Sequence, residues 1–111
     1  MVVTHRTVDG IDVIALAGRL VMADVPQVRQ RLLETVERGG GKLILDLAEV
    51  GFMDSSGLSV LVSTFKAARL KDGEVVLLHP SPTVRSLIEL TRLQQIFSIF
   101  DDENMALNRL R

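Results

Sequence analysis

The chain has 111 residues, a length typical of one domain, with 47% hydrophobic and 24% charged residues and a formal net charge of −1. This composition excludes intrinsic disorder, and the near-neutral charge argues against a nucleic-acid binder that depends on electrostatic attraction. Cysteine, tryptophan and tyrosine are absent, which excludes disulfides, thiolate nucleophiles and zinc–thiolate sites and argues against base-stacking platforms.

The first residues lack the basic, apolar and small-residue segments of a signal peptide. The longest uncharged stretch, Ser55–Phe65, is much shorter than the roughly 20 apolar residues that span a bilayer. We therefore expect a soluble, cytoplasmic protein without a membrane segment.

The first third of the chain predicts two strands and a helix. Residues Val2–Val8 alternate as in an edge strand, and Asp9–Gly10 predicts a hairpin turn into the largely apolar strand Ile11–Ala17. Asp24 is a candidate N-cap, with Pro26 in the first turn of the helix that follows. The apolar residues of this helix recur at helical spacing: Val25, Val28, Leu32 and Val36.

The middle of the chain predicts a strand, a loop and a second helix. Gly39–Gly41 ends the first helix, and the apolar run Leu43–Leu47 predicts a buried strand. We expect a loop at Ala48–Met53 and a helix that begins near Ser55 or Ser56. The apolar stripe of this helix consists of Leu58, Leu61, Val62 and Phe65.

The last third predicts a strand at Glu74–His79, a helix that starts at Ser81–Pro82 and a strand at Ile96–Phe100. The helix after Pro82 is expected to bury Val84, Leu87, Ile88 and Thr91. Asp101 or Asp102 should cap a final helix. The buried residues of that helix are predicted to be Met105, Leu107 and Leu110.

The resulting order of elements, β-β-α-β-α-β-α-β-α, predicts an α/β fold. Strands and helices alternate after the first hairpin, and helical crossovers join parallel neighbours. We expect a single domain over residues 1–111, with a mixed, mostly parallel sheet and an antiparallel N-terminal edge strand.

One loop beyond a buried strand has the composition of a functional site, since such loops concentrate function in open parallel sheets. It contains the run Phe52-Met53-Asp54-Ser55-Ser56-Gly57-Leu58 and leads into a helix N-terminus. Free N–H groups and the helix dipole favour an anion there, such as a phosphate on Ser55. Two alternatives stay open: the polar residues cap the helix or form the site, and Phe52 and Met53 form a contact surface or a hydrophobic staple.

The run Asp54-Ser55-Ser56-Gly57-Leu58, placed after a strand of the Leu43–Leu47 type, resembles the STAS domain family, above all the stand-alone anti-sigma factor antagonists. The similarity covers essentially the whole chain. It includes the opening hairpin, the Ala17-Gly18 strand end, the Ser81-Pro82 helix start and the Phe97-Ser98-Ile99-Phe100-Asp101 ending.

The resemblance implies partner switching by a protein that is a substrate and a ligand, not an enzyme. In that family a serine kinase that is also the anti-sigma factor phosphorylates the first serine after the aspartate, which here is Ser55. The unphosphorylated form binds the anti-sigma factor, phosphorylation ends that binding, and a serine phosphatase restores it. No cofactor or metal is implied, and a weak nucleotide contact at the same loop stays open.

Two positions depart from the family pattern. Many members have a second glycine where this chain has Ser59, which makes Ser59 a further contact or an alternative acceptor. Many carry an acidic residue where this chain has Val21, in a loop expected to border the phosphoacceptor loop, and this leaves the identity of the partner open. The expected partner-binding residues are therefore Val21, Phe52, Met53, Asp54, Ser56, Gly57, Leu58 and Ser59.

A second hypothesis is a non-phosphorylated STAS docking subunit of a larger assembly, such as a lipid-transport ATPase or a sensor complex. An enzyme has little support, because no base accompanies Ser55 in the sequence pattern.

The run Gly39-Gly40-Gly41-Lys42 precedes a strand and lacks a following Ser or Thr, unlike a phosphate-binding loop. His5 and His79 lie on separate strands, so no metal site is expected. A solvated basic edge is expected on the second helix, at Lys66, Arg69 and Lys71.

Overall fold

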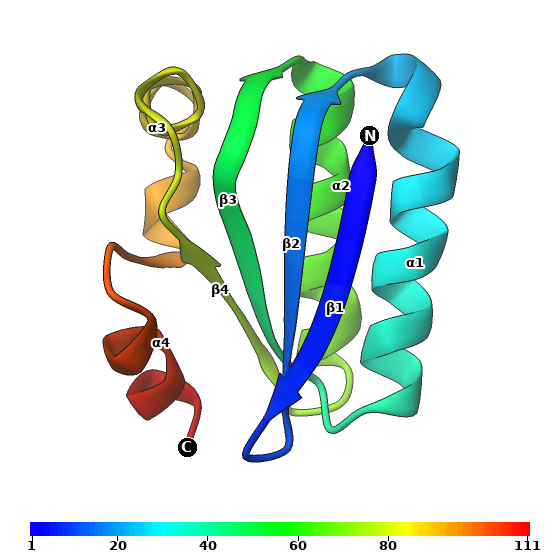
Figure 1. Ribbon diagram of the computed structural model, residues 1–111, viewed down its shortest axis with the longest axis vertical. Coiled ribbons are helices and arrows are strands. Elements are labelled where there is room, and N and C mark those ends of the chain that lie inside the picture. Colours follow the sequence, from blue (N-terminus) through cyan, green and yellow to red (C-terminus); the bar gives the residue numbers. More distant parts are fainter.

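Five strands form one sheet in the order β1-β2-β3-β4-β5 (Figure 1). The computed structural model describes residues 1–111. β1 runs antiparallel to β2, and the other neighbours are parallel, which confirms the predicted fold class. Asp9 and Gly10 both have positive φ, as the tight hairpin turn requires. The strands span Val2–Val8, Ile11–Leu20, Lys42–Met53, Glu74–Leu78 and Ser98–Phe100.

Helices cover both faces of this sheet. α1 (Val25–Arg38) and α2 (Ser55–Arg69) pack side by side on one face, and α4 (Glu103–Leu110) covers the other (Figure 1). α3 (Pro82–Leu90) packs against β3 and contributes to the core on the α1–α2 side. Two short 3-10 helices, Met22–Asp24 and Leu93–Gln95, precede α1 and β5.

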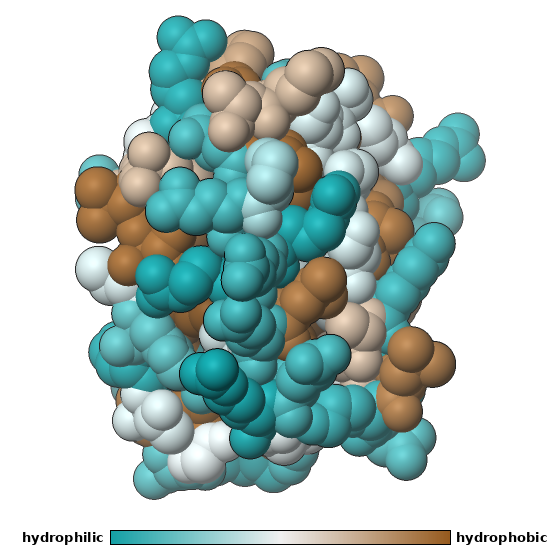
Figure 2. Space-filling view, turned by 90° about the vertical axis from the view of Figure 1, so that its right-hand side faces the viewer, coloured by the Kyte–Doolittle hydropathy of each residue, from teal (hydrophilic) through white to brown (hydrophobic).

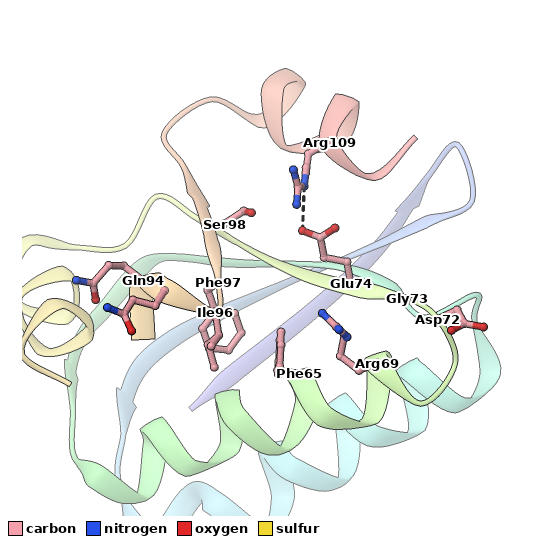
Figure 3. Close-up of a pocket in the computed structure, with 11 residues that line it drawn as sticks. Phe65, Arg69, Asp72, Gly73, Glu74, Gln94, Ile96, Phe97, Ser98 and Arg109 are labelled. Atoms are coloured by element: carbon pink, nitrogen blue, oxygen red, sulfur yellow. Dashed lines mark hydrogen bonds and ion pairs between the residues drawn. The ribbon is translucent and has the colours of Figure 1, made fainter. Parts of the chain in front are cut away.

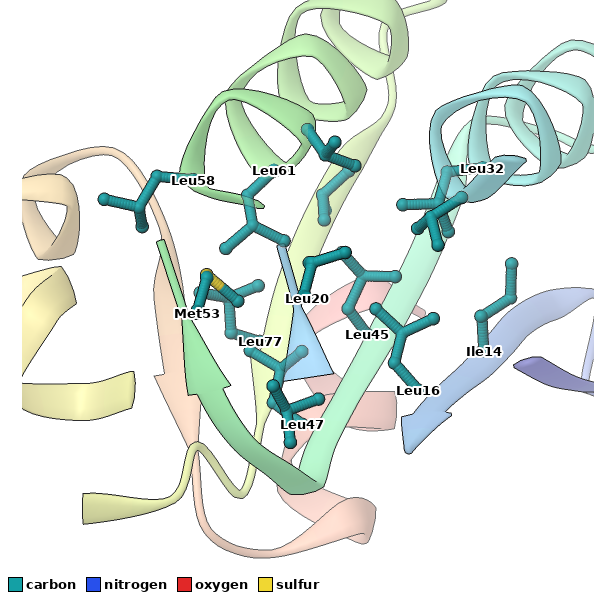
Figure 4. Packing of buried hydrophobic residues seen from close by; sticks show 14 of the residues in the cluster. Ile14, Leu16, Leu20, Leu32, Leu45, Leu47, Met53, Leu58, Leu61 and Leu77 are labelled. Atoms are coloured by element: carbon teal, nitrogen blue, oxygen red, sulfur yellow. The ribbon is translucent and has the colours of Figure 1, made fainter. Parts of the chain in front are cut away.

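The hydrophobic core is divided by the sheet into two clusters, of 21 and 8 buried residues. Burial on both faces explains why β2, β3 and β4 are nearly continuous apolar runs. Leu20, Met53, Leu58 and Leu61 belong to the larger cluster, in which the ends of β2 and β3 meet the start of α2 (Figure 4). The core therefore holds these three chain segments together at one end of the sheet.

The expected loop at Ala48–Met53 is wrong, because these residues continue β3. β2 is also longer than predicted and ends at Leu20, which pairs with Met53. The pairing passes through register shifts between Ala15 and Ala17 and between Gly18 and Arg19. Bulged pairing breaks the regular alternation from which a strand is predicted. The predicted strands therefore ended earlier than β2 and β3 do in the structure.

Three side chains also differ from expectation. Asp24 lies in helical backbone and accepts no capping hydrogen bond, because the 3-10 helix starts before it; its carboxylate is 3.7 Å from the terminal amine of Met1. Thr91 is exposed, since α3 ends at Leu90. Met105 is 58% exposed, because α4 turns its neighbour Ala106 toward the sheet instead.

Lys71 is exposed, as expected for the basic edge, but it lies in the turn after α2, and its ammonium group is engaged within the protein. Its ammonium group donates hydrogen bonds to the carbonyl oxygens of Val36, Glu37 and Gly39, at 3.1, 2.6 and 3.0 Å. These carbonyls are at the C-terminus of α1, where a helix has unpaired acceptors and the negative end of its dipole. Lys71 thus caps α1 from the turn that follows α2.

Candidate functional site

The carboxyl ends of β2 and β3 are adjacent, and the chain turns there into α1 and α2 (Figure 1). The segment after β2 contains Val21 and Met22, and the segment after β3 begins with Asp54. A hydrogen bond joins the two segments, since the Met22 backbone N–H donates to the Asp54 carboxylate at 3.2 Å. The predicted proximity of the Val21 segment to the segment that contains Asp54 and Ser55 is therefore confirmed.

Asp54 is the N-cap of α2. Its Oδ1 accepts a hydrogen bond from the Gly57 backbone N–H at 3.0 Å, while Oδ2 accepts the one from Met22. The Asp54 backbone N–H donates to the Leu20 carbonyl at 3.3 Å. This residue therefore caps the helix, as one of the two sequence interpretations expected, and also attaches the helix start to the end of β2.

Gly57 is buried where the start of α2 lies against the end of β2. A Cβ added at this position would lie 2.7 Å from the Leu20 carbonyl oxygen and 2.5 Å from Met53 Cγ. Any larger residue would push the helix start away from the strand. Glycine is thus required here for close approach, not for an unusual backbone angle.

Three serine hydroxyls lie at the start of α2, in different environments. Ser55 is exposed, and its hydroxyl forms no hydrogen bond within the protein. Ser56 is half-buried. The Ser59 hydroxyl donates to the Ser56 carbonyl at 2.9 Å and accepts from Arg29 Nη2 at 3.2 Å. Ser55 and Ser59 are both exposed, and of these two only Ser55 has a hydroxyl that forms no hydrogen bond.

The apolar residues of the predicted site divide into two groups. Met53 and Leu58 are buried in the same core cluster, at the positions that form a hydrophobic staple across a helix N-terminus. Phe52 is 40% exposed, with the Arg19 guanidinium 4.8 Å from its ring centroid. Phe52 is thus available as a contact surface, whereas the other two hold the loop in place.

The structure adds three residues to this region that the sequence pattern did not indicate. Met22 is 71% exposed beside Asp54, Arg19 covers Phe52, and Arg29 reaches from α1 to Ser59. Arg19 and Arg29 belong to other elements, and Met22 was expected in an undefined connection, so no local spacing indicated them. Figure 2 shows the side on which α1 lies, where hydrophilic side chains dominate and hydrophobic ones form small, separate patches.

The largest cavity, of about 470 Å³, lies at the amino ends of β4 and β5, the end of the sheet opposite Asp54 (Figure 3). Arg109 on its wall pairs with Glu74 at 3.0 Å, and Arg69 lies over the Phe65 ring. The cavity shares no residue with the predicted site.

No group of three metal-ligating side chains is present, and none of the helices combines the length and apolar character needed to cross a bilayer.

Comparison with known proteins supplies the family. The STAS domain family model matches residues 3–106. This chain belongs to the STAS domain family. It is 33% identical over 107 residues to the anti-sigma F factor antagonist of Paenibacillus polymyxa, which covers 96% of this chain and 89% of that protein. It is 36% identical over 97 residues to the anti-sigma-B factor antagonist of Listeria monocytogenes, which covers 87% and 84%. Both STAS relatives are named as antagonists of anti-sigma factors, which is a regulatory function.

A solved structure with the same fold is that of the anti-sigma factor antagonist SpoIIAA in its unphosphorylated form. It shares 28% identity with this STAS protein and covers 99% of this chain and 96% of that one, with a TM-score of 0.85. The phosphorylated form of the Bacillus cell fate determinant SpoIIAA shares 26% identity over 99% and 100% of the chains, with a TM-score of 0.77. The resemblance found in the sequence is thereby confirmed at the level of family and fold.

Proposed function

We propose that this protein is an anti-sigma factor antagonist whose binding to an anti-sigma factor is switched off by phosphorylation of Ser55. The observation that carries the proposal is the exposed, unbonded Ser55 hydroxyl at the start of α2, next to a fixed Asp54. The names of the STAS relatives support the antagonist function, and the existence of one relative in both phosphorylation states supports the switch. A serine phosphatase restores the binding form.

The transfer needs no catalytic group from this chain. The anti-sigma factor kinase supplies ATP, the Ser55 oxygen forms a bond to the γ-phosphorus, and the bond from that phosphorus to the bridging oxygen of ADP breaks. The hydroxyl proton leaves to the kinase or to water. Both oxygens of Asp54 accept backbone hydrogen bonds, so the role that the structure gives this carboxylate is to position the start of α2.

Phosphorylation changes the charge of the binding surface more than its shape. A phosphoserine adds about −1.5 to −2 charges next to the Asp54 carboxylate, on a protein whose net charge is −1. Ser55 is exposed and at the first position of α2, where the helix dipole favours an anion, so the fold can accept the group.

The partner then meets a dianion where it had met a neutral hydroxyl beside the exposed Met22 and Phe52. Placing like charges together, or burying a charge without a partner, costs several kcal/mol at an interface. Because about 1.4 kcal/mol corresponds to a tenfold change in affinity, we expect a loss of roughly 100- to 10,000-fold.

The first test is phosphorylation of the full chain by its cognate anti-sigma factor kinase with ATP, read by intact mass and fragmentation. One phosphoryl group is expected, on Ser55. Ser55→Ala should abolish the labelling, whereas Ser59→Ala should retain it, because Ser59 is already engaged by Arg29 and Ser56. Undiminished labelling of Ser55→Ala would refute the assignment of the acceptor.

The second test compares the affinity of the unphosphorylated and phosphorylated forms for the anti-sigma factor by calorimetry. Equal affinities would refute the switch. The competing hypothesis, a docking subunit that is not phosphorylated, predicts stable co-purification with an ATPase or sensor assembly and no labelling of Ser55 in the cell.

A further inference from the structure

Arg29, on the second turn of α1, is a cation without a carboxylate partner, since it takes part in none of the ion pairs of the structure. Its single hydrogen bond joins Nη2 to the Ser59 hydroxyl of α2. The Nε donor is buried and has no partner. A buried donor without an acceptor is costly and uncommon in folded proteins, so an additional acceptor would be favourable at this position.

Ser55 lies within one helical turn of this guanidinium. Residues four apart in an α-helix share a face, with their Cβ atoms about 5–6 Å apart, so Ser55 and Ser59 are neighbours on the surface of α2. Side chains in a helix also lean toward its N-terminus, and the Ser59 hydroxyl does so, since it bonds the Ser56 carbonyl. The Arg29 group that bonds Ser59 is therefore directed to the turn that begins with Ser55.

The charged groups around Ser55 also favour Arg29 as the partner of a phosphate at that position. A phosphate on Ser55 would stand next to the Asp54 carboxylate, and the two negative groups would repel each other. The nearby Arg19 is already placed over the Phe52 ring, and Asp24 lies near the terminal amine of Met1. Arg29 is thus the cation on this edge that remains without a charged or aromatic partner.

We propose that Arg29 holds the phosphate carried by Ser55, so that phosphorylation ties α2 to α1. The inference rests on the proposed phosphorylation of Ser55. Guanidinium and phosphate form strong, charge-assisted hydrogen bonds, and the planar guanidinium can donate two of them in parallel. The phosphate then lies across the junction of α1 and α2, and its charge is partly compensated within the protein while the surface offered to the partner changes.

The experiment uses the full chain with phosphoserine incorporated at position 55 during translation, so that it does not depend on a kinase. NMR follows the Nε–Hε group of Arg29, and urea unfolding follows stability, for wild type and for Arg29→Gln with and without the phosphate. In the wild type, phosphorylation should move the Hε signal downfield and slow its exchange with water. For each protein, the unfolding equilibrium constant with the phosphate is divided by the constant without it. This ratio should be about tenfold larger for Arg29→Gln than for wild type, because the variant lacks the guanidinium that holds the phosphate.

Arg31→Gln is the matched control, because it removes the same charge from the same helix at an exposed residue that forms no ion pair. It should respond to phosphorylation as the wild type does. An unchanged Arg29 signal, or equal responses of the Arg29 and Arg31 variants, would overturn the inference. A kinase that leaves Ser55 unmodified would instead refute the proposed function, so the two failures are distinguishable.

Discussion

Replacement of Gly57 by alanine tests whether the start of α2 must lie directly against the end of β2. The new Cβ would be 2.7 Å from the Leu20 carbonyl oxygen and 2.5 Å from Met53 Cγ, whereas carbon atoms in favourable contact are about 3.5–4.0 Å apart. The Met53 side chain can rotate away. The Leu20 carbonyl cannot, because Leu20 pairs with Met53 of β3 and its carbonyl accepts the Asp54 backbone N–H.

Two opposite effects determine the change in the free energy of unfolding. Alanine is favoured over glycine inside a helix by about 1 kcal/mol. Overpacking costs about 1–3 kcal/mol, and a displaced helix start weakens the hydrogen bonds of Asp54 to Met22 and Gly57, each worth about 1 kcal/mol or more. The net expectation is a loss of about 1–3 kcal/mol.

Urea unfolding followed by circular dichroism measures this loss. Gly51→Ala is the matched control, since an added Cβ there meets no atom within 4 Å, and its stability should stay close to that of the wild type. The Gly57 variant should also bind the anti-sigma factor more weakly, because the loop shifts. A folded Gly57→Ala protein as stable as wild type would refute the claim that this close approach positions the loop.

Three further predictions concern neighbouring contacts. Asp54→Ala should lower the free energy of unfolding by about 1–2 kcal/mol through loss of the cap, and Asp54→Asn by less; equal urea midpoints for wild type and Asp54→Ala would contradict the capping role. Lys71→Met should cost about 1–2 kcal/mol in the same assay, because three carbonyls of α1 lose their donor, whereas Lys66→Met, at an exposed lysine, should change stability by less than about 0.5 kcal/mol. Ser55→Asp should keep the wild-type circular dichroism spectrum and lose affinity for the anti-sigma factor in calorimetry; unchanged affinity would count against the electrostatic account.

Local chemistry was sufficient at most turns and caps, with the N-cap predicted at Asp24 as an exception. The Asp9–Gly10 turn, the Ser81 cap and the Asp102 cap occur as predicted, because each depends on backbone groups within three residues. Prediction failed where a partner is distant in sequence. The extension of β3 beyond Leu47 depends on bulged pairing with β2, and the capping of α1 by Lys71 depends on the packing of α2 beside α1.

The sequence by itself determined the α/β fold, the position of the Asp54–Leu58 run at a helix start, and the family resemblance, because hydrophobic periodicity and capping residues are local properties. Only the tertiary structure decided which side chains near this segment stay exposed. Met53 and Leu58 are buried in the core, whereas Phe52 and Met22 remain exposed. The Ser55 hydroxyl has no hydrogen-bond partner, whereas the Ser59 hydroxyl accepts a hydrogen bond from Arg29. These differences arise from neighbours on β2 and α1, which the chain brings to the loop only when it folds.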